Sequence, residues 1–214
     1  MPLQNRVSPF GRIDTTPARG LFTGNRGVIH DPDRKALLRR RWTTKAWIVC
    51  VCAFRDRRRA VMGRNGPAGG TGWTELFFLD EVTALAAGHR PCFFCRRDAA
   101  KRFMACVREA EGGAEMKAVQ ADTILHAQRF AVSGKAHMLS SATVPDLPDG
   151  TVIAVGELAY ALRDGTLREW RFEGYGAARS PDTLPPEVQL LTPPLSVSAL
   201  RAGYAPVWHD SVAS

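Results

Sequence analysis

Four of the five cysteines lie in two closely spaced pairs, and this spacing constrains the fold more than any other feature of the chain. Cys92 and Cys95 form a C-x-x-C pair, which lets two thiolates bind one tetrahedral zinc ion. Cys50 and Cys52 form a C-x-C pair upstream, on a predicted strand whose alternate side chains share a face. We therefore expect a structural zinc ion bound by these four sulfurs.

Other uses of these cysteines stay open. His89 or His126 could replace one member of the strand pair in a Cys3His site. The C-x-x-C pair could be a redox pair, although such pairs open a helix in a β-α-β unit, which this segment only partly offers. Because the N-terminus lacks an apolar signal region, we expect reduced thiols and a cytoplasmic, nucleoid-associated protein. Cys106 lies in the apolar stripe of a predicted helix and is expected in the core.

Positive charge is concentrated in one segment. The chain has 29 basic and 21 acidic residues, and between Arg34 and Arg64 the basic residues face only one acid, Asp56. Such a field attracts polyanions, so we expect DNA as the partner, with binding that weakens as salt rises. The alternative is a solvated surface in an arginine-rich protein. The residues expected to contact nucleic acid are Arg39, Arg40, Arg41, Arg55, Arg57, Arg58, Arg59, Arg90, Arg96 and Arg97.

Hydrophobic periodicity predicts a mixed α+β fold. Asp80 is a predicted N-cap for a short helix that Gly88 closes. Asp164-Gly165 is a predicted hairpin turn. The other predicted helices are 97–110, 115–132 and 196–202, and the predicted strands are 47–54, 74–79, 151–156, 158–162, 167–172 and 188–191.

The predicted elements divide the chain into three parts. Residues 1–33, rich in glycine and proline, are expected to form a partly ordered arm. Residues 34–144 are expected to form the basic, zinc-binding α/β part, and residues 145–214 a mainly β C-terminal part. No stretch is apolar for long enough to span a membrane, so no membrane partner is expected.

The run Ala84–Cys95, ALAAGHRPCFFC, with Asp98 after it and Phe77-Phe78 before it, resembles the zinc domain of the Ada-type adaptive-response DNA methylphosphotriester repair proteins. The resemblance covers residues 74–98. The same run is similar to a set of uncharacterised bacterial proteins that share the signature ALAAGHRPCxxCRR.

This resemblance implies an Ada-like fold for the N-terminal part, a four-cysteine zinc site and a role in repair or the DNA-damage response. Cys92 and Cys95 match the later pair of the family's zinc ligands. The family's earlier pair is spaced C-x-x-x-C, whereas this chain has Cys50-Val51-Cys52. The first cysteine of that pair accepts a methyl group in the family, and Cys50 would be its counterpart here.

If the zinc is structural, other groups must carry any reaction. Glu75, Asp122, His126, Arg129 and His30 are the candidates, because a carboxylate beside an imidazole makes a general base and a guanidinium stabilises phosphorane-like charge. Mg²⁺ or Mn²⁺ on the carboxylates could activate water. Asp80 is expected as a helix cap rather than as a metal ligand. Asp122 and His126 could form an ordinary surface pair instead of a catalytic one.

Three functions follow from these observations. The first is a zinc-stabilised DNA endonuclease that hydrolyses phosphodiesters in repair. The second is a DNA-binding or regulatory zinc protein without catalysis. The third is a methyl acceptor from DNA methylphosphotriesters, in which a zinc-bound thiolate is the nucleophile.

Overall fold

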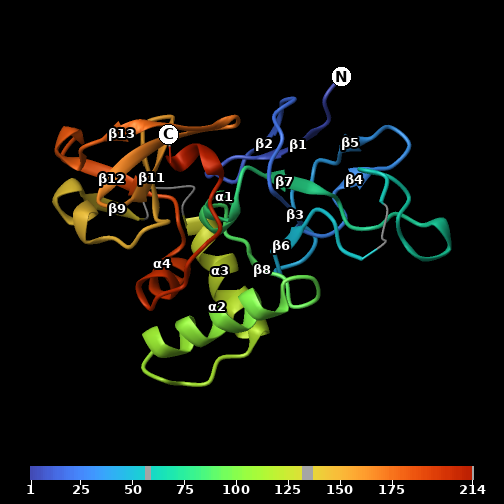
Figure 1. The fold of residues 1–214 in the computed structure, drawn as a ribbon. Helices are drawn as coiled ribbons and strands as arrows, with labels where there is room; N and C mark the ends of the chain where they lie inside the picture. Colours follow the sequence, from blue (N-terminus) through green and yellow to red (C-terminus); the bar gives the residue numbers. More distant parts are fainter. Residues whose placement is uncertain (56–58, 132–136, 214) are drawn as a thin grey trace.

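The computed structural model describes residues 1–55, 59–131 and 137–213. The chain combines α-helices with two six-stranded sheets, an N-terminal sheet and a C-terminal sheet, as expected for an α+β fold with a β-rich C-terminal region. The sheets lie on opposite sides of the short helix α1, and the longer helices extend to one side of both (Figure 1). Among the described helices, none is long and apolar enough to cross a membrane.

The N-terminal sheet has the strand order β2-β1-β7-β3-β6-β8. Strand β1 runs parallel to β7, and β6 runs parallel to β8, whereas the other neighbours are antiparallel. A separate two-stranded ribbon pairs β4 with β5. The strands are β1 (Gln4–Val7), β2 (Ile13–Thr15), β3 (Phe22–Asn25), β4 (His30–Asp31), β5 (Ala36–Leu37), β6 (Ile48–Val51), β7 (Leu76–Phe78) and β8 (Arg90–Pro91).

Residues 1–33, expected as an arm, supply β1, β2, β3 and β4. Burial explains this difference, because Val7, Ile13 and Phe22 pack with Leu76 and Phe78 in one core cluster. Strand pairing that involves residues so distant in the sequence leaves no local signal beyond short apolar runs between glycines and prolines.

Helix α1 (Glu81–Ala86) is buried along its whole length. Its N-cap Asp80 accepts a hydrogen bond from the amide of Thr83, and Gly88 follows with φ +76°, as the sequence predicts. Ala84 packs on the N-terminal sheet, Val82 on the C-terminal sheet, and Leu85 on the other helices. The short helix therefore joins all parts of the core.

Two carboxylates at the start of α1 tie distant segments together. Asp80 accepts hydrogen bonds from Tyr175 Oη at 2.8 Å and from the His209 amide at 3.1 Å. Burial raises the pKa of the Asp80 carboxyl. Glu81 is paired through both oxygens with Arg96 at 2.7 and 2.8 Å and accepts from Tyr204 Oη at 2.6 Å. These contacts fix α1 to the C-terminal sheet, to the next helix and to the C-terminal segment.

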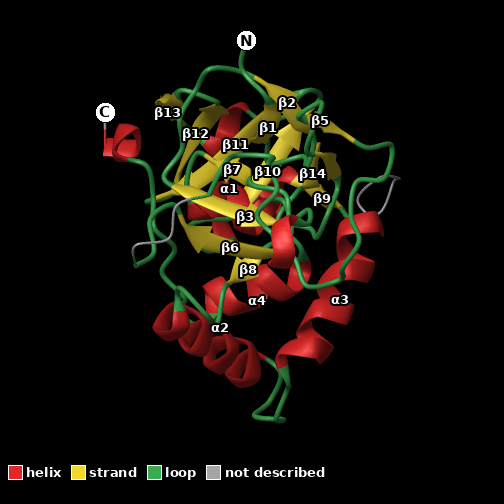
Figure 2. Ribbon diagram, turned by 90° about the vertical axis from the view of Figure 1, so that its right-hand side faces the viewer, coloured by secondary structure: helices red, strands yellow, loops and turns green. Residues whose placement is uncertain are grey.

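Three further helices form a layer below the sheets (Figure 2). Helix α2 matches the predicted range at both ends, α3 begins three residues later than predicted, and α4 begins two residues earlier. Phe103, Leu125 and Leu200 are central to the cluster that joins them, and Cys106 is buried there as expected. The helices are α2 (Arg97–Ala110), α3 (Ala118–Ala131) and α4 (Pro194–Arg201).

The C-terminal sheet is antiparallel throughout, with the order β13-β12-β11-β10-β14-β9. Asp164 and Gly165 connect β11 and β12 with φ values of +48° and +70°, so the predicted Asp-Gly hairpin is confirmed. The strands are β9 (Met138–Ser140), β10 (Val152–Val155), β11 (Leu158–Arg163), β12 (Thr166–Arg171), β13 (Gly174–Arg179) and β14 (Glu187–Leu190). Short 3-10 helices span Pro67–Gly69, Ser141–Asp146, Pro181–Thr183 and Asp210–Ala213.

Candidate metal centre

Three cysteines converge at the end of the N-terminal sheet. The sulfur atoms of Cys50, Cys92 and Cys95 all lie within 4.8 Å of one another. Cys50 belongs to β6, and the parallel pairing of β6 with β8 places the residues that follow β8 beside it. The amide of Cys92 then donates to the carbonyl of Val49 at 3.0 Å, which sets the C-x-x-C turn beside Cys50.

The local backbone also points donors at these sulfurs. The amide of Phe94 donates to Cys92 Sγ at 3.3 Å, and the amide of Val51 bonds to the sulfur of Cys95. The amide of Arg96 donates to the carbonyl of Cys92 at 3.0 Å and closes the turn that leads into α2. Amide donors favour the thiolate form, which is the form that binds metals.

The protons of the three thiols are distributed unequally. Hydrogen bonds from Cys50 and Cys95, then from the amides of Cys95 and Phe94, lower the pKa of Cys92 to about 2. The hydrogen bonds to Cys92 and Cys95, together with burial, raise the pKa of Cys50 well above its ordinary value. The thiolate form is therefore favoured at Cys92 over Cys50, and a cation would favour it at all three sulfurs.

The spacing of the sulfurs fits a metal ion. A zinc–sulfur bond of about 2.3 Å places the sulfurs of a tetrahedral site about 3.8 Å apart. Sulfur atoms within 4.8 Å of one another need only small side-chain shifts to reach that separation. The three cysteines could therefore hold a metal ion.

Cys52 does not join this group. Cys50 and Cys52 line the same cavity, but Cys52 lies beyond the end of strand β6 at Val51, and its sulfur is not one of the three that lie within 4.8 Å of one another. The Cys52 thiol is exposed and donates to the carbonyl of Leu21 at 3.5 Å. The structure therefore brings together three of the four expected ligands.

The two histidines considered as replacements also lie elsewhere. His89 is fully buried, with its ring centroid 5.1 Å from Trp47 and 4.7 Å from Phe78. His126 packs edge-on against Trp42, with the ring centroids 4.5 Å apart. Neither histidine belongs to the group of three cysteines.

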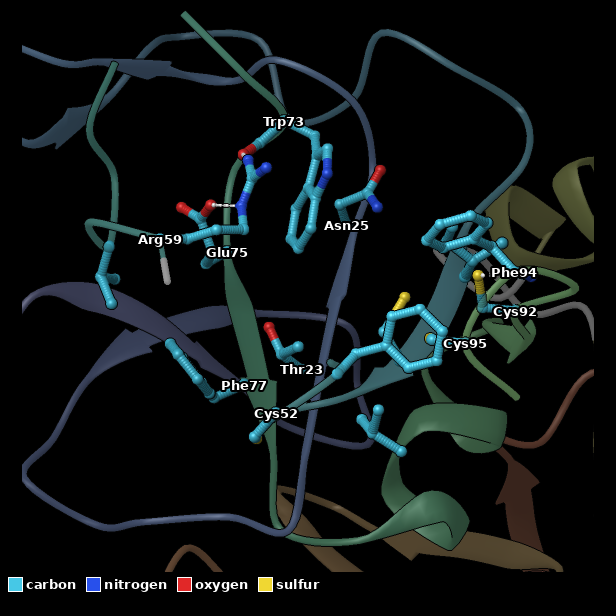
Figure 3. A pocket seen from close by; sticks show the side chains of 15 residues that line it. Thr23, Asn25, Cys52, Arg59, Trp73, Glu75, Phe77, Cys92, Phe94 and Cys95 are labelled. Atoms are coloured by element: carbon cyan, nitrogen blue, oxygen red, sulfur yellow. Dashed lines mark hydrogen bonds and ion pairs between the residues drawn. The ribbon is translucent and has the colours of Figure 1, made fainter. Parts of the chain in front are cut away.

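A cavity of about 450 Å³ opens in front of the cysteines. Alternation along the strands produces it, because Phe22, Val49 and Leu76 face the core while Thr23 and Cys50 face the cavity. Figure 3 shows the side chains that line the cavity, among them Thr23, Arg59, Glu75, Cys92 and Cys95. The remaining labelled lining residues include Asn25, Trp73, Phe77, Phe94 and Cys52.

Aromatic rings and cations form the edge of this cavity. Phe54 and Phe94 lie 5.2 Å apart by their ring centroids, and the guanidinium group of Arg55 lies 5.0 Å from the Phe54 ring. Phe94 is 57% exposed beside the two cysteines of its own turn. At the other end, the guanidinium group of Arg59 lies 4.1 Å from the ring centroid of Trp73. The cavity can therefore receive a flat or apolar group next to the sulfurs.

Two of the expected catalytic residues hold a loop in place. Glu75 accepts hydrogen bonds from Arg59 Nε at 2.7 Å and from the amide of Met62 at 2.9 Å. His30 has Nδ1 2.7 Å from Thr74 Oγ1 and Nε2 3.3 Å from the carbonyl of Gly63. Glu75 lines the cavity, but Arg59 and the amide of Met62 already donate hydrogen bonds to its two oxygens.

The other three expected catalytic residues lie on α3. Asp122 is paired with Arg90 through both oxygens at 2.8 and 2.7 Å. His126 Nδ1 lies 3.4 Å from Arg129 Nη1. The cysteine group is the one set of three or more potential metal ligands found among the described residues.

The arginines expected to bind nucleic acid fall into three groups. Arg59, Arg90 and Arg96 form ion pairs with Glu75, Asp122 and Glu81, respectively. Arg57 and Arg58 lie outside the described residues. The arginines with exposed side chains are Arg39, Arg40, Arg41, Arg55 and Arg97.

Sequence patterns did not identify the cavity residues Thr23, Asn25 and Trp73. The polar alternation in Phe22-Thr23-Gly24-Asn25 is the signal that could have found the first two, because it marks a strand with one apolar and one polar face. No family model, curated protein or solved structure matches the chain.

Proposed function

We propose that the chain is a zinc protein that acts on DNA and accepts alkyl groups from damaged phosphates. Cys50, Cys92 and Cys95 would bind the zinc, and one of these sulfurs would be the nucleophile. The observation that carries this proposal is the convergence of three cysteine sulfurs at the wall of a cavity.

The donor set favours zinc. Three sulfur ligands suit a soft or borderline metal, and zinc is the common metal of such sites in proteins. When bound, the zinc ion would keep the three sulfurs as thiolates, which are far better nucleophiles than thiols. Zinc binds four ligands, and three cysteines would leave its fourth coordination position free. Because the three sulfurs line the cavity, that position would be open to a molecule in the cavity.

Charge decides which reaction this centre suits. Three thiolates carry one more negative charge than a zinc ion neutralises, so the centre repels an ordinary anionic phosphodiester. An alkylated phosphate in DNA is a neutral triester and escapes that repulsion. In the transfer, a sulfur–carbon bond forms, the carbon–oxygen bond breaks, and the oxygen leaves as the anion of the restored phosphodiester. No proton or external reductant is needed, and each chain reacts once.

Exposure favours Cys95 as the acceptor. Cys50 and Cys92 are 7% and 6% exposed, whereas Cys95 is half-buried and lines the cavity beside Phe94. The resemblance to the Ada-type domain gives this role to the earlier pair and therefore to Cys50. Identifying the modified cysteine distinguishes these assignments.

The surroundings of the centre suit a DNA strand. Arg55 and Arg97 are exposed near the cysteine turn, where their guanidinium groups can bind phosphate oxygens. Phe94 offers an exposed ring to a base or sugar. These side chains supply affinity for a neighbouring phosphodiester while the neutral triester enters the cavity.

Phosphodiester hydrolysis, the reaction first expected, has less support. A nuclease needs a free general base or a metal that binds phosphate oxygens. Glu75 and Asp122 are each saturated by an arginine, and His30 is buried against Thr74.

The test uses duplex DNA that contains one methylphosphotriester, incubated with the zinc-loaded protein. We expect intact mass spectrometry to detect the gain of one CH2 per chain, and peptide mapping to find it on Cys95. Cys52→Ala is the matched control, since it removes an exposed cavity thiol outside the group of three and should react like the wild type. A protein that stays unmodified while it binds this DNA would overturn the methyl-transfer proposal.

A further inference from the structure

A buried arginine, Arg26, and a half-buried arginine, Arg129, contact one tryptophan ring. The guanidinium groups of Arg26 and Arg129 each lie 4.0 Å from the ring centroid of Trp47. Arg26 follows β3 and is only 2% exposed, whereas Arg129 comes from the last turn of α3. The fold therefore brings two cations from distant segments to one aromatic ring.

These two arginines differ from Arg90 and Arg96 in their partners. Arg90 and Arg96 each face a carboxylate oxygen at 2.7 Å. No ion pair within 4.0 Å joins Arg26 or Arg129 to a carboxylate among the described residues. The charge of Asp122 acts on Arg129 from beyond that distance, whereas only burial and the positive charge of Arg129 act on the pKa of Arg26. Burying a charge without a partner of opposite sign is costly, so Arg26 calls for an anion.

Neutral groups satisfy only part of each guanidinium group. Arg26 donates to the carbonyl of Gly11 at 2.9 Å and to Nε2 of His89 at 3.3 Å. Arg129 donates to the carbonyls of Gly88 and Lys45 at 2.8 and 3.1 Å. Nη2 of Arg26 and Nε of Arg129 are buried and have no hydrogen-bond partner among the described residues. Arg26 thus keeps one buried donor without an acceptor, whereas the free donor of Arg129 faces Gly88.

Both arginines line a cavity of about 220 Å³, together with Arg41, Trp42 and Trp47. Arg41 and Trp42 are exposed and lie where the cavity meets the solvent, and Arg26 lies at its buried end. An adjoining cavity shares Arg26 and Arg41 and contains one acidic residue, Asp14, which forms no ion pair with either arginine in the described part of the chain.

Both guanidinium groups keep their charge at neutral pH. Burial and the neighbouring Arg129 lower the pKa of Arg26 to about 9. Burial also lowers the pKa of Arg129 to about 9. Both values stay above neutrality, so the cavity presents two positive charges.

We propose that this cavity binds a phosphoryl group, held by Arg26 and Arg129. A phosphate monoester carries between one and two negative charges near neutral pH, and its oxygens match two planar guanidinium forks better than a carboxylate does. The cavity is smaller than the roughly 300–1,000 Å³ typical of sites for drug-sized ligands. Its size therefore suits the phosphate alone, either free in solution or at the end of a nucleic acid whose remainder lies over Arg41.

This inference is independent of the cysteine centre, and its test does not involve metal. The probe is inorganic phosphate, added at constant ionic strength against a chloride control and followed by calorimetric titration and thermal unfolding. We expect one saturable site per chain and a rise in Tm with phosphate concentration. In Arg26→Met, the affinity should fall about tenfold or more, because one charge-assisted contact is lost.

Two comparisons keep this test decisive. Arg26→Met should fold without phosphate, since it replaces an unpaired buried cation by an apolar side chain of similar length. Arg171→Met removes an exposed arginine of the C-terminal sheet and should bind phosphate like the wild type. Equal responses of the wild type and of both variants, or no response in the wild type, would overturn the proposal.

Competition between inorganic phosphate and oligonucleotides identifies the source of the bound phosphate. A short 5′-phosphorylated oligonucleotide that displaces inorganic phosphate, when its unphosphorylated counterpart does not, supports a terminal phosphate as the ligand. Displacement by neither oligonucleotide, with saturable binding of inorganic phosphate, supports the free anion in the same site.

Discussion

The amide of Cys92 donates a hydrogen bond of 3.0 Å to the carbonyl of Val49, the residue before Cys50. This bond continues the parallel pairing of β6 with β8 and sets the C-x-x-C turn against the strand that carries the third cysteine. The metal ligands are therefore positioned by sheet pairing, with the turn adding its own amide donors.

The first prediction concerns metal content. Elemental analysis of the purified protein should give one zinc ion per chain, and Cys50→Ser, Cys92→Ser and Cys95→Ser should each lose most of it. Cys52→Ser and Cys106→Ser should keep it, because their sulfurs lie outside the group. Chelation should lower the stability by several kcal/mol, since zinc bound by thiolates contributes about 10–16 kcal/mol in zinc-finger peptides. Retention of zinc by Cys95→Ser together with its loss in Cys52→Ser would contradict this ligand set.

Local patterns predicted the elements whose signals are complete within a few residues. The Asp80 cap, the Gly88 stop, the full range of α2 and the Asp164-Gly165 hairpin all follow from turn chemistry and helical periodicity. The C-x-x-C pair was predicted because its spacing carries its own geometry, whereas Cys50 was predicted only together with Cys52.

Features that depend on distant contacts were not predictable in this way. Cys52 lies beyond the strand end at Val51 and donates to the carbonyl of Leu21, and nothing in the C-x-C spacing reveals where a strand ends. Arg90 and Arg96 looked like free surface cations, but Asp122 and Glu81 reach them from other elements. Tertiary pairing thus converts part of the basic surface expected from the sequence into buried ion pairs.

The second prediction concerns Glu81, which accepts hydrogen bonds from Arg96, Tyr204 and the amide of Val207. Glu81→Gln should lower the free energy of unfolding by about 3–5 kcal/mol, because it leaves the buried Arg96 without its counter-charge. Glu157→Gln is the matched control, since its ion pair with Arg12 is exposed and should contribute about 1 kcal/mol or less. Urea titrations measure both, and equal losses would show that Glu81 has no special role.

The third prediction concerns Gly88, whose φ of +76° disfavours other residues. A Cβ atom there would lie 2.9 Å from Nε of Arg129. Gly88→Ala should therefore cost more than the roughly 1 kcal/mol of left-handed backbone strain alone. Gly165→Ala, with φ +70° and no atom within 4 Å of the added Cβ, isolates that strain. The difference in urea midpoint between the two variants measures the steric part, which vanishes if Arg129 moves freely.

The fourth prediction concerns the exposed arginines. If Arg39 and Arg40 contact phosphates, Arg39→Ala and Arg40→Ala should each weaken DNA binding and reduce the slope of log K against log salt by about 1. Arg171→Ala, at an exposed ion pair of the C-terminal sheet, should leave the slope unchanged. Fluorescence anisotropy over a salt series measures all three slopes, and a wild-type affinity that does not vary with salt would exclude a phosphate-binding surface.

The last prediction concerns pH. Burial, followed by the charges of Arg26 and Arg129, lowers the pKa of His89 well below its ordinary value. The unfolded chain therefore binds a proton at about pH 6.5 that the folded chain refuses, so stability is complete above this pH and falls as pH drops below it. The slope is at most about 1.4 kcal/mol per pH unit for this group. Burial lowers the pKa of His126 as well, which adds to the loss of stability in the same direction.

His89→Gln keeps an acceptor for Arg26 Nε but cannot be protonated, so its stability between about pH 7 and 5 should decline less steeply than that of the wild type. Urea titrations across this range test it, and parallel curves for the two proteins would mean that His89 takes up its proton while still folded.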